Sequence, residues 1–124
     1  MDSGRIKLEE FNGVLFCDAY MNDEFSLGDL ETIRDEIRRN FSSSTDLICR
    51  ESGSFSVAGD VQKTLCKGID EFLNVVYVAE NDAKRNAARY AAETYMQKYN
   101  IRIADSKEAA YALLSQKVDN IFGS

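Results

Sequence analysis

The sequence contains no histidine, no proline and no tryptophan, and these absences exclude whole classes of site. Without histidine, the chain cannot build a Ser-His-Asp or Cys-His nucleophilic system, or a metal site with an imidazole ligand. Without proline, no helix can carry this residue in its first turn, so we expect Ser, Asn or Asp to start the helices. The three cysteines, Cys17, Cys49 and Cys66, form no CxxC pair, which argues against a zinc ribbon or a redox dithiol.

The net charge of −6 is unevenly distributed along the chain. Residues 1–80 carry 8 basic and 16 acidic side chains, a balance of −8, whereas residues 81–124 carry 7 and 5, a balance of +2. Because an acidic chain repels phosphate groups, we expect neither nucleic acid nor an anionic membrane surface as a partner. No signal peptide and no integral membrane segment is expected either, so we expect a reduced, cytoplasmic protein.

The length of 124 residues and the apolar content of 44% predict one α/β domain that spans residues 1–124. Asn12-Gly13 lies between two strand-like runs and predicts a type I′ turn that closes an N-terminal β-hairpin. The remaining pattern predicts three further strands, at 45–51, 73–79 and 101–103, and four helices, at 26–41, 57–69, 81–99 and 105–122. The order ββαβαβαβα therefore gives a five-stranded mixed sheet with helices on both faces, because parallel strands need crossover helices.

The residues that start the helices can be proposed from their spacing. Ser26 with Asp29 three residues later matches a capping box, and we expect Asn81 or Asp82 and then Asp105 to cap the last two helices. The helix after Asn81 carries a stripe of small residues that would let it approach the sheet closely, namely Ala83, Ala87 and Ala91, followed by Tyr95. In the second strand, the acidic Asp18 interrupts an apolar run and must find a partner or lie at an edge.

Two strands and two helices in the second half carry a resemblance to a known family. They are the run 72–80, the alanine-rich helix with Arg85, Arg89 and Tyr90, the short strand 101–103, and the first part of the last helix, at 106–114. Together with the element order, they resemble STAS domains, the bacterial anti-sigma-factor antagonist fold, and related small α/β modules similar to CRAL-TRIO lipid-binding domains. The resemblance implies a non-catalytic regulatory module of a bacterial cytosol that binds a protein partner or forms a homodimer. Since the chain lacks histidine and no spacing singles out a carboxylate pair or a glycine-rich phosphate loop, we expect no catalytic residue, no metal and no cofactor.

The resemblance also implies a site of phosphorylation. In antagonist proteins, an Asp-Ser-(Ser/Thr)-Gly stretch after the third strand carries a serine that the partner kinase phosphorylates. The matching segment here runs from Ser54 to Gly59, which makes Ser56 the implied phosphoacceptor and Ser54 the second choice. The segment lacks the acidic residue before the serine and a second hydroxyl after it. The competing interpretation is structural, with Ser56 as the N-cap of the next helix.

Open α/β sheets bind ligands beyond the carboxyl ends of their strands, and the residues expected there are acidic. They are Glu24, Glu51, Glu80, Asp82 and Asp105. Such a rim could hold a divalent cation or a basic partner, although helix capping explains several of these residues equally well. A hydrolase would depend on an acidic residue such as Glu51 or Glu80. The alternative function is a small-molecule or lipid-binding domain similar to CRAL-TRIO proteins, which would contain an apolar cavity between the sheet and a helix pair.

Overall fold

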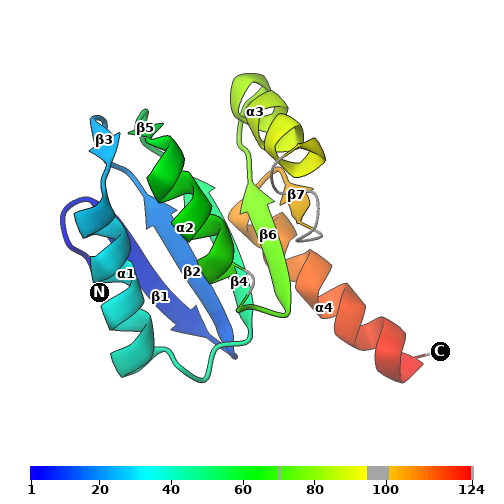
Figure 1. Ribbon diagram of the computed structural model, residues 1–124. Coiled ribbons are helices and arrows are strands. Elements are labelled where there is room, and N and C mark those ends of the chain that lie inside the picture. Colours follow the sequence, from blue (N-terminus) through cyan, green and yellow to red (C-terminus); the bar gives the residue numbers. More distant parts are fainter. Residues whose placement is uncertain (70, 95–100, 124) are drawn as a thin grey trace.

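The computed structural model describes residues 1–69, 71–94 and 101–123, and the side chains of 66 and 116–123 are not discussed. The elements along the chain are β1 (Ile6–Phe11), β2 (Val14–Ala19), β3 (Glu24–Phe25), α1 (Leu27–Asn40), β4 (Asp46–Glu51), β5 (Ser56–Val57), α2 (Gly59–Ile69), β6 (Asn74–Val78), α3 (Asp82–Glu93), β7 (Arg102–Ala104) and α4 (Lys107–Gly123). Across the described residues, this confirms the predicted α/β class with a five-stranded mixed sheet and four helices (Figure 1).

The main sheet has the strand order β1-β2-β4-β6-β7. β1 is antiparallel to β2, and every later neighbour in the sheet is parallel to the strand before it. The hairpin between β1 and β2 turns at Asn12 and Gly13, whose φ angles of 51° and 78° confirm the predicted left-handed turn. Four strands therefore run in the same direction, and their carboxyl ends meet at one edge of the sheet.

The two faces of the sheet bury different sets of side chains, because successive residues of a strand point to opposite sides. Leu15 and Leu47 lie on the face that α1 and α2 cover. Their neighbours Phe16 and Ile48 lie on the opposite face, against α4. Figure 1 shows α1 and α2 in front of the sheet and α4 behind it.

Two helices start as their sequences predict. Ser26 Oγ accepts a hydrogen bond of 3.2 Å from the backbone N–H of Asp29, and the Asp29 carboxylate accepts one of 2.9 Å from the backbone N–H of Ser26. This capping box begins α1. In α3, Asn81 Oδ1 accepts from the backbone N–H of Lys84 at 2.9 Å, so Asn81 is the cap.

Within the described ranges, no helix has both the length and the apolar character needed to span a bilayer.

The start of α4 differs from the prediction by one residue. Ser106 Oγ, and not Asp105, accepts from the backbone N–H of Ala109 at 3.1 Å, so Ser106 takes the capping position. Asp105 instead pairs with Arg85 on α3, at 2.7 Å. The prediction was wrong here because two adjacent residues were both good caps, and the cation on another helix decided between them.

The alanine stripe of α3 does not pack closely along its whole length. Ala91 is buried, as predicted, but Ala83 and Ala87 are exposed. α3 ends at Glu93, whereas the prediction extended the helix to about Tyr99; the positions of Tyr95 and Tyr99 lie outside the described residues. Small side chains allow close packing but do not by themselves require it.

A second small sheet, which the sequence did not suggest, joins the loops after β2 and β4. β3 and β5 pair in parallel, with Phe25 opposite Val57. The two loops also approach each other at Gly53, where a Cβ atom would collide with the backbone of Tyr20 and Met21. Glycine is therefore required there for close approach of the two backbones. The β3–β5 pairing and the close approach at Gly53 hold the two loops together above the carboxyl ends of the strands.

Candidate functional site

The acidic residues predicted at the carboxyl edge of the sheet do not converge on one point. Glu24 and Glu80 are exposed and lie on separate segments. Asp82 and Asp105 both pair with Arg85, at 3.4 and 2.7 Å, so their charges are partly balanced within the chain. In the part of the chain that the structure describes, no three acidic or cysteine side chains are grouped as metal ligands. The rim thus offers no arrangement for a divalent cation among these residues.

Ser54 and Ser56 both lie exposed between β4 and α2. Because α2 begins at Gly59, the interpretation of Ser56 as the helix N-cap was wrong. Ser56 belongs to the small second sheet, where its backbone N–H donates to the Asp23 carbonyl oxygen at 3.1 Å. The Ser54 N–H donates to Asn22 Oδ1 at 3.0 Å. A phosphate on Ser56 would precede the helix instead of lying on its first amides, and phosphorylation of either serine stays a prediction.

The buried Asp18 forms an ion pair with a basic residue, as its position in an apolar strand requires. Its carboxylate lies 2.8 Å from the Arg50 guanidinium and accepts a 2.7 Å hydrogen bond from the Ser52 hydroxyl. Arg50 in turn lies over the ring of Phe16, 5.0 Å from its centroid. These contacts are on the α4 face of the sheet, and they give Asp18 a structural explanation.

A cavity of about 250 Å³ lies between the sheet and the helix pair α1–α2. Its walls are mainly apolar: Leu15 and Leu47 come from the sheet, Ile33 and Ile37 from α1, and Leu65 from α2. For comparison, an apolar cavity of about 150 Å³ is large enough to bind benzene. The position and the lining are those that the sequence analysis named as the mark of a small-molecule or lipid-binding domain.

The middle of the cavity floor is formed by two thiols. Cys17 on β2 and Cys49 on β4 are directly opposite each other in the parallel register, and both line the cavity. Burial raises the pKa of the Cys17 thiol to about 12 and raises the pKa of Cys49 well above its usual value. Both groups are therefore neutral at physiological pH and present weakly polar, polarisable surface to an occupant.

Charged side chains surround one end of this cavity. Arg34 and Arg38, one helical turn apart on α1, line it from one side, and Lys67 on α2 lines it from the other. Glu71, just after α2, is the acidic residue at the same end. All four residues are exposed, so their charged groups meet solvent while neighbouring apolar side chains form the interior. The cavity thus combines an apolar interior with a mainly cationic border.

Glu51, at the end of β4, lines the cavity at the opposite end from Lys67. The residue has exposed surface, but protein atoms surround its carboxyl group, and this burial raises the pKa of Glu51 against an opposing effect of Lys84. Lys84 Nζ also donates to the Glu51 carbonyl oxygen. Of the five predicted rim residues, Glu51 lines this cavity, whereas Asp105 lines a separate hollow between β7 and α4.

A second groove, of about 290 Å³, lies between α2 and α3. Ala87, Ala88 and Ala91 form its α3 side, which explains why part of the alanine stripe remains accessible. The lining residues that it shares with the first cavity are Cys49, Glu51, Phe55, Leu65 and Tyr77. The two hollows therefore adjoin beneath α2.

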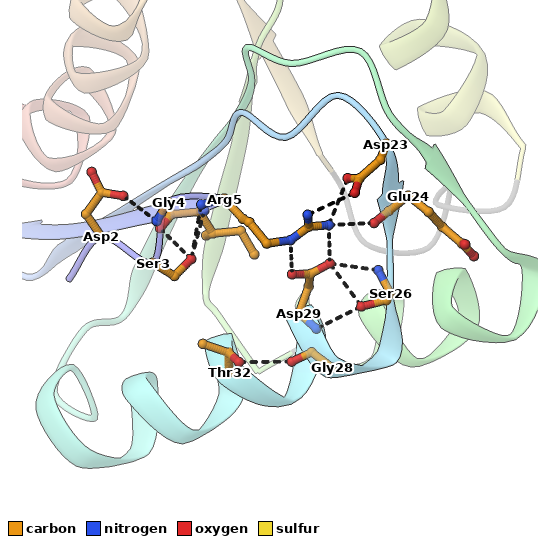
Figure 2. Close-up of polar contacts among 11 residues, drawn as sticks. Asp2, Ser3, Gly4, Arg5, Asp23, Glu24, Ser26, Gly28, Asp29 and Thr32 are labelled. Carbon is orange, nitrogen blue, oxygen red and sulfur yellow. Dashed lines mark hydrogen bonds and ion pairs between the residues drawn. The ribbon is translucent and has the colours of Figure 1, made fainter.

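One guanidinium fastens the start of α1, and with it one wall of the cavity, to the N-terminal segment (Figure 2). Arg5 Nε and Nη2 donate to the two carboxylate oxygens of Asp29 at 2.8 and 3.1 Å. Its Nη1 and Nη2 also donate to Asp23 at 3.0 and 2.9 Å, and Nη2 donates to the Glu24 carbonyl oxygen at 2.8 Å. The hydrogen bonds from Arg5, with further ones from Ser26, lower the pKa of Asp29 against the effect of burial. This cluster is a structural support of α1.

Sequence reasoning identified the residues at the carboxyl edge and missed most of those that line the cavity. It considered Cys17 and Cys49 only for their lack of a CxxC spacing, and it did not single out Arg34 and Arg38. Two features of the sequence together could have indicated the cavity. One is a small side chain at corresponding positions of two adjacent strands, and the other is a set of basic residues beside the apolar stripe of a helix. They could be recognised only once the strand register and the facing helix were known.

A scan of protein-family models finds no match to the chain. Searches of curated proteins and of solved structures give no significant match either. The cavity and its charged border are therefore the features from which a function can be inferred.

Proposed function

We propose that this chain is a non-catalytic domain that binds one small, largely apolar molecule in the cavity between the main sheet and α1–α2. The observation that carries the proposal is the cavity itself, about 250 Å³ in volume and lined mainly by aliphatic and aromatic side chains. Ligand sites for drug-sized molecules are typically about 300–1,000 Å³ and apolar with a few polar groups, so this site suits a ligand at or below the small end of that range.

Packing energetics supports the same conclusion. Protein cores contain few voids larger than a water molecule, because unfilled space forfeits dispersion contacts. Here the void lies in the middle of a core, above two strands whose other face is filled by Phe16 and Ile48. Replacing cysteine with a larger side chain at Cys17 or Cys49 would close the space easily. The small side chains at both positions favour an occupant over close packing.

The test fills the cavity. In the Cys49→Phe variant, the new ring would occupy the floor, so binding of 1-octanol should be abolished while the melting temperature stays the same or rises. The matched control is Thr32→Phe, which adds a ring at an exposed position of α1 that does not line the cavity. Isothermal titration calorimetry measures octanol binding, and native mass spectrometry of the purified chain detects any molecule that copurifies.

A folded Cys49→Phe variant that binds octanol as the parent chain does would overturn the proposal, as would a parent chain that binds no apolar probe. If Cys49→Phe does not fold, the smaller Cys17→Met change provides the second test, because methionine extends into the same space with a flexible side chain. In that variant, octanol affinity should fall by about tenfold, with near-UV circular dichroism unchanged.

The second candidate is a cytoplasmic STAS-like interaction module that acts through a protein partner or as a homodimer. The element order supports it, and so does the exposure of Leu73 and Tyr90, which leave 80% and 66% of their surface uncovered. If Ser56 regulates such an interface, Ser56→Asp should weaken self-association or partner binding without changing the melting temperature, with Ser54→Asp as the matched comparison. Sedimentation equilibrium of the two variants measures this. Equal, monomeric behaviour of all three chains would argue against the homodimer.

A further inference from the structure

We infer that the ligand of the α1–α2 cavity carries an anionic headgroup on a short apolar chain, with the headgroup bound by Arg34, Arg38 and Lys67. This inference rests on the proposed function and specifies its ligand class. The apolar walls of the cavity would hold the chain, and the three cations at its border would hold the negative charge.

The three cations at the border of the cavity are not engaged by carboxylates of the described part of the chain, a property that they share with Arg39, Lys63 and Arg89. Within the described residues, none of Arg34, Arg38 and Lys67 has an ion-pair partner within 4.0 Å. By contrast, Arg5 and Arg50 in the same part of the chain are committed to buried or half-buried carboxylates. The cations that border the cavity therefore keep their charge and their hydrogen-bond donors available for an external anion.

The charge at this border is opposite in sign to the net charge of residues 1–80. Residues 1–80 carry a balance of −8, yet the cavity border has three cations and one acidic residue, Glu71, at the same end. Arginine presents a planar fork of donors that matches a carboxylate or a phosphate in a bidentate manner. Two such forks one helical turn apart, facing Lys67 across the opening, are complementary to a single anionic head.

Helix electrostatics offers a simpler explanation for part of this pattern. Arg38 and Lys67 lie in the last turns of α1 and α2, where cations interact favourably with the helix dipole. Arg34 lies further inside α1 and gains less from that effect. Arg39 provides a matched control, because it shares the last turn and the exposure of Arg38 but does not line the cavity.

The opposite end of the cavity sets the direction of the chain. Glu51 and Phe55 lie near the carboxyl ends of the strands, whereas Arg38 and Lys67 lie near the ends of their helices at the other edge. At the Glu51 end an anionic head would meet a carboxylate beside Lys84, whose Nζ already donates to the Glu51 and Gly53 carbonyl oxygens, whereas at the Lys67 end it meets three cations. The chain therefore extends from the cationic border past the thiol floor toward Phe55.

The experiment compares three probes with the same eight-carbon chain: octanoate, octyl phosphate and 1-octanol. Isothermal titration calorimetry on the intact chain should show octanoate or octyl phosphate binding at least about tenfold more tightly than octanol. Arg34→Gln combined with Arg38→Gln should remove about tenfold or more of the anion affinity and less than about twofold of the octanol affinity. Arg39→Gln should change neither, and added salt should weaken only the anions.

Each outcome separates this inference from the function on which it rests. If no probe binds, the ligand-binding function itself is wrong. If octanol binds as tightly as the anions, or if Arg39→Gln lowers anion affinity as much as the double change does, the cavity binds apolar molecules and the headgroup inference is wrong. Preference for octanoate over octyl phosphate identifies a carboxylate ligand, and the reverse identifies a phosphate. If the double variant does not fold, Lys67→Gln alone should lower anion affinity by about threefold to tenfold.

Discussion

The two faces of the main sheet use adjacent residues of the same strands and reach opposite results. On the α4 face, Phe16 and Ile48 are paired across β2 and β4 and are fully buried. One residue further along, Cys17 and Cys49 are paired across the same strands on the α1–α2 face. The first pair fills the space beneath its helix, whereas the second leaves a cavity of about 250 Å³.

The two pairs differ in side-chain volume, whereas the backbone at both is regular. Both pairs lie in regular parallel register, and both faces are covered by helices. Polar groups follow the same division: Asp18 and Arg50 neutralise each other on the α4 face, while Arg34 and Arg38 border the cavity without such a partner among the described residues. One face is therefore closely packed, and the other contains the cavity of the proposed binding site.

The largest expected effect on stability comes from removing a large buried side chain from the α4 face. Phe16→Ala should cost about 3–5 kcal/mol in the free energy of unfolding, because it removes a fully buried ring and leaves a new void. Cys17→Ala, on the other face, should cost below about 1 kcal/mol because its side chain already borders open space. Urea unfolding followed by circular dichroism measures both. Similar losses for the two variants would show that the faces are equally packed.

A smaller effect should follow from loosening only the α1 wall. Ser26→Ala removes the N-cap of α1 and should cost about 1 kcal/mol, with faster amide exchange in α1 and unchanged exchange in α4. Ser106→Ala is the matched change for the other face, because it removes the cap of α4. If Ser26→Ala instead raises exchange in both helices equally, the two layers unfold as one unit.

The same wall should respond to acid. Hydrogen bonds from Arg5 hold the pKa of Asp29 below its usual value of 3.8, so this interaction stabilises the fold fully above about pH 5. The stabilisation is lost as the pH falls from there through the lowered pKa of Asp29. Asp29→Asn should therefore lower the melting temperature at neutral pH and flatten its decline in acid. An acid profile that is identical in parent and variant would assign the decline to other carboxylates.

The smallest perturbation is chemical labelling of the thiol floor. In a Cys66→Ser background, alkylation of Cys17 and Cys49 by iodoacetamide should be slow at pH 8 and accelerate about tenfold per pH unit, since burial raises the pKa of Cys17 to about 12. Octanoate should slow the reaction further by covering the floor. Mass spectrometry at timed intervals measures both effects. A rate that levels off near pH 9 would indicate thiols with ordinary pKa values.

Much of the fold could be predicted because it depends on local patterns. The Asn12-Gly13 turn, the capping box at Ser26 and the apolar runs of the central strands each specify structure within a few residues. The errors arose where two local solutions competed. Ser106 caps α4 in place of its neighbour, and the segment around Ser56 pairs with β3 and does not start α2, because partners distant in the sequence decided the outcome.

The candidate site was less predictable, since its parts are separated in the sequence and its main feature is an absence of side-chain volume. The acidic rim followed from a general rule for parallel sheets, but Glu51 is the member of that group that lines the α1–α2 cavity, and Asp105 lines a separate hollow. The composition still carried one element of the answer. The basic residues Arg34 and Arg38 were visible beside an apolar helix stripe within a strongly acidic part of the chain.

The sequence alone determined the class of fold, the hairpin, and the set of side chains available for chemistry, because periodicity, turn propensity and composition are properties of neighbouring residues. Only the tertiary structure decided that Cys17 and Cys49 lie side by side beneath two helices and that Arg34, Arg38 and Lys67 border the same opening. The physical reason is that strand register and helix docking are set by the burial of the whole core, and no single segment contains that information.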